Sequence, residues 1–172
     1  ANDTRQPLCI LTDAEFSVED GTAGLGAVVF GANGKPREYF SEKVPTDVVA
    51  ALQRAAGTDH VVSALELLAV LAAAKTWKAE SFHRRVFVAV DNDAARAALV
   101  RASSAAPAMR RLVKTLLVHD AEWPSYRWVL RVPSKANVSD APSRLDLREL
   151  KAARARRRYL NWEDLDLKVT LG

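Results

Sequence analysis

Four carboxylates interrupt otherwise apolar stretches of this 172-residue sequence, and they are the side chains with the clearest capacity for chemistry. Asp13 and Asp91 each follow a short apolar run, Glu66 is the only charged residue in a stretch of fourteen, and Asp140 lies where a polar loop runs into a helix. Burying an unpaired carboxylate costs several kcal/mol, so such groups need a partner, a metal ion or a water-filled cleft. If the four acids converge, they can hold two divalent ions about 4 Å apart, and oxygen ligands favour Mg²⁺ or Mn²⁺ over zinc.

Each acid also has a structural explanation that involves no chemistry. Asp13 could belong to a turn, and Asp91 or Asn92 could be the N-cap of the helix that follows. Glu66 could form a capping box with Ser63, and Asp140 could share an N-cap with Ser139. The capping box would begin its helix at Ser63 and leave the alternative caps, Thr58 or Asp59, unused. The arrangement favours a joint role, because two of the acids end strands, and α/β sheets build their sites at strand ends.

The spacing of the apolar runs predicts an α/β fold, in which helices cover a mixed sheet. Residues 8–12 and 25–30 are short apolar runs, and the glycines between them (Gly21, Gly24 and Gly26) predict the turn of an antiparallel meander that continues into 37–40. A nearly continuous apolar stretch over about 59–78 predicts a buried helix, and the β-branched run 86–90 predicts a strand covered on both faces. The remaining predicted elements are helices at 94–102 and about 108–119, a strand at 126–132, a loop at 133–139 and a closing helix from about 140 or 145 to 158.

Composition predicts one globular domain over residues 1–172, with a core at about 8–145 and a basic C-terminal helix and tail at about 146–172. The apolar content of 49% is enough for a core, and the longest uncharged apolar run, near 67–74, is far short of the roughly 18 residues needed to cross a bilayer. The single cysteine, Cys9, excludes an internal disulfide and a Cys-based zinc site. Because the chain begins without methionine and shows no signal peptide, we expect a domain of a longer polypeptide.

The net charge of +4 is concentrated near the C-terminus. Residues 148–158 hold one acid, Glu149, and six cations: Arg148, Lys151, Arg154, Arg156, Arg157 and Arg158. One explanation is contact with phosphates, above all through Arg154 and Arg157. The other is a solvated helix end, because arginines replace the apolar stripe that Leu147 and Leu150 begin, and cations suit a helix C-terminus. The stretch NWEDLDLKV that follows is apolar enough to fold back on the body of the domain.

Several segments of the sequence resemble the type 1 ribonuclease H domain of reverse-transcribing retroelements. They are LTDAEFS and GTAGLGAVVF in the hairpin, SALELLAVLAAAKTW in the helix, VFVAVDNDAARAAL in the buried strand and its turn, and RVPSKANVSDAPSR near the end. The resemblance covers about residues 8–145, and its most specific parts are the last segment and VDN-x-AA. It implies the ribonuclease H-like fold, a five-stranded mixed sheet of three antiparallel hairpin strands plus parallel strands, with helices on both faces.

The same resemblance implies an endoribonuclease that cuts the RNA strand of an RNA·DNA hybrid with two Mg²⁺ or Mn²⁺ ions. The implied catalytic and metal-binding acids are Asp13, Glu66, Asp91 and Asp140. The positions that match the surroundings of the site, and that we expect to shape it or to meet substrate, are Asn92, Asn137, Ser143 and Arg144. We add Lys135, whose cation can attract the scissile phosphate or its neighbour.

The resemblance also implies partners and a location. The expected partners are the RNA·DNA hybrid and an adjacent polymerase domain in a longer polypeptide, with no membrane involved. The expected location is intracellular, in the cytoplasm, the nucleus or a retroelement particle, and the oligomeric state stays open.

Two departures from the family pattern keep other functions open. The loop 133–139 lacks the histidine that bacterial and many viral members carry there, and we expect the three histidines of the chain at the surface or at helix ends. Glu15 completes a D-x-E triplet with Asp13, as in 3′-to-5′ exonucleases of the same superfamily, although Lys135 and Ala136 occupy the places of the Tyr or His that those enzymes need. A catalytically silent module that only binds nucleic acid or protein is the other alternative. Transposases and resolvases share the fold, but the retroelement-like segment offers them no support.

Overall fold

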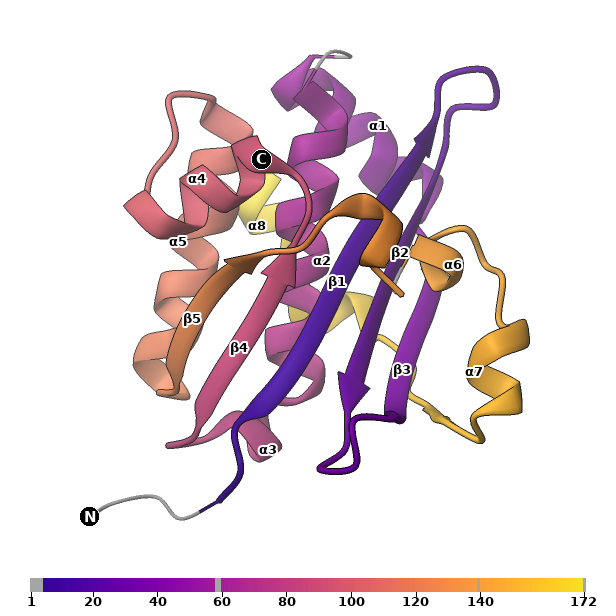
Figure 1. Cartoon of the computed structure of the whole chain (residues 1–172). Coiled ribbons are helices and arrows are strands. Elements are labelled where there is room, and N and C mark those ends of the chain that lie inside the picture. Colours follow the sequence, from indigo (N-terminus) through magenta and orange to yellow (C-terminus); the bar gives the residue numbers. More distant parts are fainter. Residues whose placement is uncertain (1–4, 58–59, 139, 172) are drawn as a thin grey trace.

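The protein is described by a computed structural model that covers residues 5–57, 60–138 and 140–171. Its centre is a mixed sheet of six strands in the order β5-β4-β1-β2-β3-β6 (Figure 1). The strands are β1 (Leu8–Ser17), β2 (Thr22–Phe30), β3 (Pro36–Lys43), β4 (Arg85–Val90), β5 (Tyr126–Arg131) and β6 (Arg156–Arg157). β1, β2 and β3 form the predicted antiparallel meander, and β4 and β5 run parallel to β1.

Helices cover both faces of this sheet, as predicted, but unequally (Figure 1). The helices are α1 (Thr46–Ala56), α2 (Val61–Thr76), α3 (Lys78–Ser81), α4 (Asp93–Arg101), α5 (Pro107–Glu122), α6 (Asp140–Ser143), α7 (Arg148–Ala152) and α8 (Leu167–Leu171), with 3₁₀ turns at Ser134–Ala136 and Trp162–Leu165. The large core lies under α1, α2 and α5, and the tail does fold back, because Leu165 and Leu171 join that core. On the other face Leu150 of α7 packs against Val28 and Tyr39. None of the described helices is long and apolar enough to cross a membrane.

The central helix α2 is the buried helix that the apolar stretch predicted. Twelve of its sixteen residues are buried, and its run of small alanines lets it lie close to the sheet. It begins at Val61, so Ser63 is inside the helix, and the capping-box explanation of Glu66 is wrong. The alternative caps, Thr58 and Asp59, lie outside the described residues.

Two predicted turn glycines lie instead within a strand. Gly24 and Gly26 belong to β2, where they pair with Glu15 and Asp13 of β1, and the turn before β2 is made at Gly21, whose φ is 63°. The sequence pattern also missed α1, which contributes only Val49 and Leu52 as buried residues and therefore has a weak apolar signal.

The predicted basic helix near the C-terminus is wrong, and so is the count of five strands. α7 ends after five residues, Arg154 takes a φ of 55°, and Arg156–Arg157 form the sixth strand, which pairs in parallel with Glu38 and Tyr39 of β3. The apolar stripe of Leu147 and Leu150 ends at this point, so a further helical turn would have no apolar side chains to pack on the sheet.

Two of the basic residues are used inside the fold. The guanidinium of Arg157 donates to the carbonyl oxygen of Ser41 at 2.7 Å and lies over the ring of Tyr159, so it has a structural role, and its contact with phosphates stays a prediction. Arg158 lies 3.5 Å from the carboxylate of Glu38 and 3.2 Å from that of Glu80, and it donates to the carbonyl of Thr76. Arg154 remains exposed.

This arrangement makes Arg158 a structural residue. Glu38 is buried, and Trp77 donates to it at 3.3 Å, so Arg158→Gln would leave a buried carboxylate without its closest cation. We expect the free energy of unfolding to fall by about 2 kcal/mol. The matched control Arg154→Gln should change it by less than about 0.5 kcal/mol, because that side chain is exposed. Urea unfolding of both variants checks this, and equal effects would contradict it.

Candidate metal centre

The site forms where β1 extends beyond its neighbour β4. The parallel pairing of the two strands covers Leu8 to Leu11 of β1, although β1 itself continues to Ser17. Beyond that point the backbone N–H of Ala14 donates to Oε1 of Glu66 at 3.1 Å, in place of a strand partner. The end of β4 therefore opens a gap through which a side chain of α2 reaches β1.

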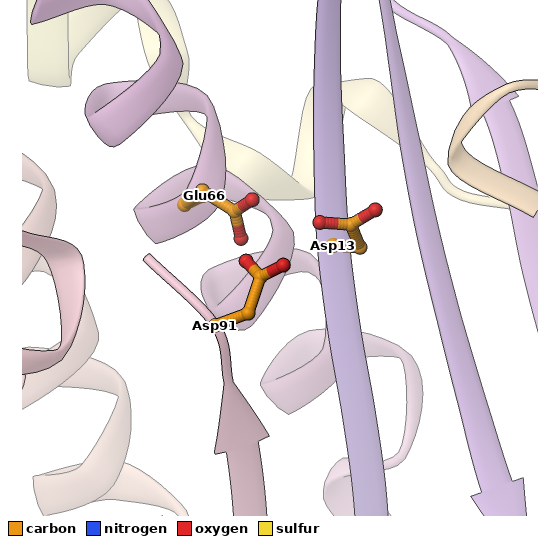
Figure 2. A group of neighbouring side chains, drawn as sticks. All are labelled: Asp13, Glu66 and Asp91. Atoms are coloured by element: carbon orange, nitrogen blue, oxygen red, sulfur yellow. The ribbon is translucent and has the colours of Figure 1, made fainter. Parts of the chain in front are cut away.

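Three of the four predicted acids meet in this gap. One carboxylate oxygen each from Asp13, Glu66 and Asp91 lies within 4.8 Å of the others. Figure 2 shows Glu66 of α2 and Asp91, just past the end of β4, facing Asp13 of β1. Asp13 is 4% exposed and Glu66 2% exposed, so these two acids are largely cut off from water, whereas Asp91 is half-buried. We call these three residues the acidic cluster.

Asp140 lies beside the acidic cluster without joining it. Its charge acts on Asp13, which places the two carboxylates near each other. Its Oδ1 accepts a hydrogen bond from Nε of Arg144 at 3.1 Å, one helical turn further along the chain. The structure thus brings three predicted ligands together and pairs the fourth with an arginine.

The short helix α6, which carries Asp140, is held against the sheet by backbone contacts. Gly24 of β2 makes this possible, because a Cβ there would collide with the carbonyl oxygen of Ser143. Ser41 of β3 donates to the carbonyl of Pro142 at 2.6 Å, and the hydroxyl of Ser143 lies 2.9 Å from Oδ2 of Asp13. Gly24 and Ser41 are functional residues that the sequence analysis missed; a glycine inside an apolar strand is the signal that could have marked the first.

The other predicted site residues divide into buried and exposed ones. Asn137 is buried and donates to the carbonyl of Thr12, and Ser143 is buried against Asp13, so both shape the site, and a contact with substrate stays a prediction. Asn92 is the N-cap of α4, where its side chain accepts from the N–H of Ala95, which confirms the cap alternative for this residue. Lys135 is exposed on the loop beside the site and stays a predicted substrate contact.

Burial and mutual repulsion shift the ionisation of the cluster. Burial raises the pKa of Asp13 to about 6, and the charges of Asp91 and Asp140 add to the effect, while hydrogen bonds with Glu66 and Ser143 oppose it. Burial raises the pKa of Glu66 to about 10, with further contributions from the charge of Asp13 and a hydrogen bond with it. Without a cation the two carboxyl groups therefore hold a proton at neutral pH.

The cluster fits a divalent metal ion. The donors are carboxylate oxygens alone, and Oε2 of Glu66 is buried with no hydrogen-bond partner among the described residues. A buried acceptor of this kind is costly unless something pairs with it, and a hard cation such as Mg²⁺ or Mn²⁺ would do so.

Glu15 and the histidines lie outside the cluster. The carboxylate of Glu15 lies 3.2 Å from Nη1 of Arg144, which gives the D-x-E triplet a partner other than a metal ion. His60 and His83 are exposed as expected, and His119 lies in the last turn of α5, so it meets the helix-end expectation although it is buried. Burial lowers the pKa of His119 to about 4, and the charge of Lys75 adds to this, so the ring is neutral.

The fold is that of known ribonucleases H. No protein-family model matches the chain, and no curated protein matches it significantly. Among solved structures, LC11-RNase H1, isolated from compost by a metagenomic approach, has a TM-score of 0.64 at 15% identity and covers 86% of this chain and 99% of its own. The same enzyme in complex with an RNA/DNA hybrid gives 0.62 at 14% identity, over 84% and 99%. RNase H1 from the halophilic archaeon Halobacterium salinarum NRC-1 gives 0.59 at 16%, over 84% and 99%.

The raised pKa values predict how the metal-free protein responds to pH. The folded state keeps protons on Asp13 and Glu66 that the unfolded chain releases above about pH 4, so the free energy of unfolding should fall from pH 5 to pH 8. Glu66→Gln removes much of this loss and keeps an oxygen for the N–H of Ala14. With EDTA at pH 8 its Tm should exceed the parent's by about 4 °C or more, since 1 kcal/mol is worth roughly 2–4 °C. Thermal unfolding at both pH values measures this, and a variant less stable than the parent at pH 8 would refute it.

Proposed function

We propose that this chain, which has the ribonuclease H fold, is a metal-dependent endoribonuclease that hydrolyses the RNA strand of RNA·DNA hybrids. The observation that carries the proposal is the convergence of Asp13, Glu66 and Asp91 from three separate parts of the chain into one group, in which the first two are buried and Asp91 is half-buried. A silent binding module of this fold has no need to bury two acids and hold a third against them, because their burial and repulsion cost stability. That a neighbour of this fold binds an RNA/DNA hybrid supports the choice of substrate.

Asp13, Glu66 and Asp91, with Asp140 as the fourth ligand, would hold two Mg²⁺ or Mn²⁺ ions. Such ions would supply Lewis-acid polarisation of a phosphate and a nucleophile at neutral pH. The protein's own residues orient the ligands: Ala14 fixes Glu66 through its N–H, Ser143 lies against Asp13, and Asn137 ties the preceding loop to β1. The walls of α2 and the sheet keep water from the inner side of the group.

A pocket beside the site suits a polyanion. It has a volume of about 260 Å³, and its lining includes the cation Lys43, the ion pair of Arg144 and Glu15, and the hydroxyl-bearing residues Ser17 and Thr22. Cations and hydroxyls are the groups that bind phosphates without reading sequence. Together with Lys135, which is exposed on the loop before α6, they would hold the hybrid backbone near the acidic cluster.

A retroelement origin is a further part of the proposal. It is supported by the segment RVPSKANVSDAPSR, which supplies Asn137, Asp140 and Ser143 to the site. A polymerase domain in the same polypeptide would then deliver the hybrid.

Cleavage of a labelled RNA·DNA hybrid in Mg²⁺ or Mn²⁺ tests the function directly. We expect internal cuts in the RNA strand, and no cuts in duplex DNA, duplex RNA or either single strand. EDTA should abolish cleavage. Release of single nucleotides from a 3′ end would instead favour the exonuclease alternative, and binding without cleavage would favour the silent module.

The role of Asp91 can be tested against a neighbouring acid. Asp91→Asn keeps the shape but removes a negative ligand, so hydrolysis should fall by orders of magnitude while the Tm is kept or raised. Asp93→Asn is the matched control: it makes the same chemical change on the same segment, at an exposed residue paired with Arg96 and Arg131. The control should keep activity within about twofold. Full activity in Asp91→Asn would exclude a metal-ligand role.

The loop 133–138 and His119 provide a second test. Lys135→Ala should raise KM by about threefold or more and leave kcat within about threefold, because an exposed cation attracts phosphate without entering the chemistry. His119→Ala should leave kcat within about threefold below its Tm, since the ring is buried and neutral. Steady-state and single-turnover kinetics separate binding from cleavage. A collapsed kcat with an unchanged KM in Lys135→Ala would give the lysine a chemical role.

A further inference from the structure

Arg144 lies between two carboxylates that belong to different elements. It lies four residues after Asp140, directly after the end of α6, and its Nε lies 3.1 Å from Oδ1 of Asp140. Its Nη1 lies 3.2 Å from Oε1 of Glu15 on β1. The planar guanidinium has donors on both sides, so one arginine can serve both acids at once.

The two partners of Arg144 differ in what else they do. Asp140 is the predicted metal ligand that does not join the acidic cluster, and here its carboxylate is taken up by the arginine. Glu15 lies two residues after Asp13 on the same strand, so both side chains point to the same face of the sheet. Glu15 is also outside the cluster. The exonuclease pattern would make it a metal ligand, but among the described residues its carboxylate does not join the group that could hold a metal ion.

We infer that Arg144 is a positioning residue that neutralises Asp140 in the metal-free protein and is retained by Glu15 when Asp140 turns to a divalent ion. The inference rests on the proposed function, because it assigns a device to the same site. Arg144 and an incoming cation compete for one carboxylate, so the arginine lowers the affinity for metal. Glu15 offsets that competition, because it gives the guanidinium another partner at the same position.

The effect of Arg144 on metal binding depends on Asp140, which distinguishes it from the general effect of a nearby charge. Removing any cation near a metal site tightens metal binding, and removing any anion weakens it. If Arg144 acts through Asp140, however, its removal should tighten metal binding only when Asp140 is present, because it is Asp140 that becomes free to bind the ion. Likewise, loss of Glu15 should weaken metal binding most when Arg144 is present, because Arg144 then pairs with Asp140 alone.

The test is a Mn²⁺ titration of the metal-free protein without nucleic acid, followed by the electron paramagnetic resonance signal of free Mn²⁺. Arg144→Met should tighten binding about threefold to fivefold in the parent, the size expected of a partly exposed ion pair, and by less than about 1.5-fold in an Asp140→Asn background. Glu15→Gln should weaken binding about threefold in the parent and less in an Arg144→Met background. Asp146→Asn is the control: it breaks an exposed ion pair with Arg148 on the same segment and should change nothing.

The outcomes separate this inference from the function on which it rests. Equal effects of Arg144→Met with and without Asp140, or a Glu15→Gln effect that is as large without Arg144, would overturn the inference. If Asp91→Asn still weakens Mn²⁺ binding strongly in that case, the proposed function stands. Mn²⁺ binding that is insensitive to Asp91→Asn would overturn both. Arg144 is largely exposed, with 57% of its side chain accessible, so its variants should fold.

Discussion

The constraint on which this structure depends is the burial of several like charges in one place. Asp13 and Glu66 are almost inaccessible, Asp91 is within 4.8 Å of both, and burial together with mutual repulsion raises the pKa of the two buried acids. The hydrogen bond between Asp13 and Glu66 offsets only part of this cost in a metal-free chain. The backbone must therefore impose the arrangement, and much of the fold can be understood as the means of doing so.

Three features of the scaffold impose it. β1 is longer than β4, which leaves an N–H of Ala14 free for Glu66; α2 is so apolar that packing fixes it against the sheet; and Gly24 admits the backbone of α6. The apolar core, which lies apart from the acids, supplies the stability that the acidic cluster loses. The sheet and α2 are rigid elements, which suits a site whose ligands must keep their distances.

A second buried carboxylate shows the opposite solution. Glu38 accepts a hydrogen bond from Trp77 and lies 3.5 Å from Arg158, so its charge is met by partners within the chain. Among the described residues, no cation forms an ion pair with the acidic cluster, and Arg144 pairs with Asp140 and Glu15, which lie outside it. Glu38 thus has a structural role and holds the tail on the sheet, whereas the carboxylates of the acidic cluster need a bound cation to balance their charge.

The sequence by itself determined the chemistry of the site and the order of most elements. Carboxylates in apolar surroundings stand out because burial is costly, so Asp13, Glu66 and Asp91 could be selected before any coordinates, and the apolar runs located the meander, α2 and β4. Local patterns could not foresee that Gly24 lies against the backbone of Ser143, that the basic segment becomes β6, or that Arg158 pairs with Glu38, because each depends on a partner distant in the sequence. Only the tertiary structure decided that Arg144 stands between Asp140 and Glu15, since the contact joins two elements whose approach is set by the packing of α6 on β2.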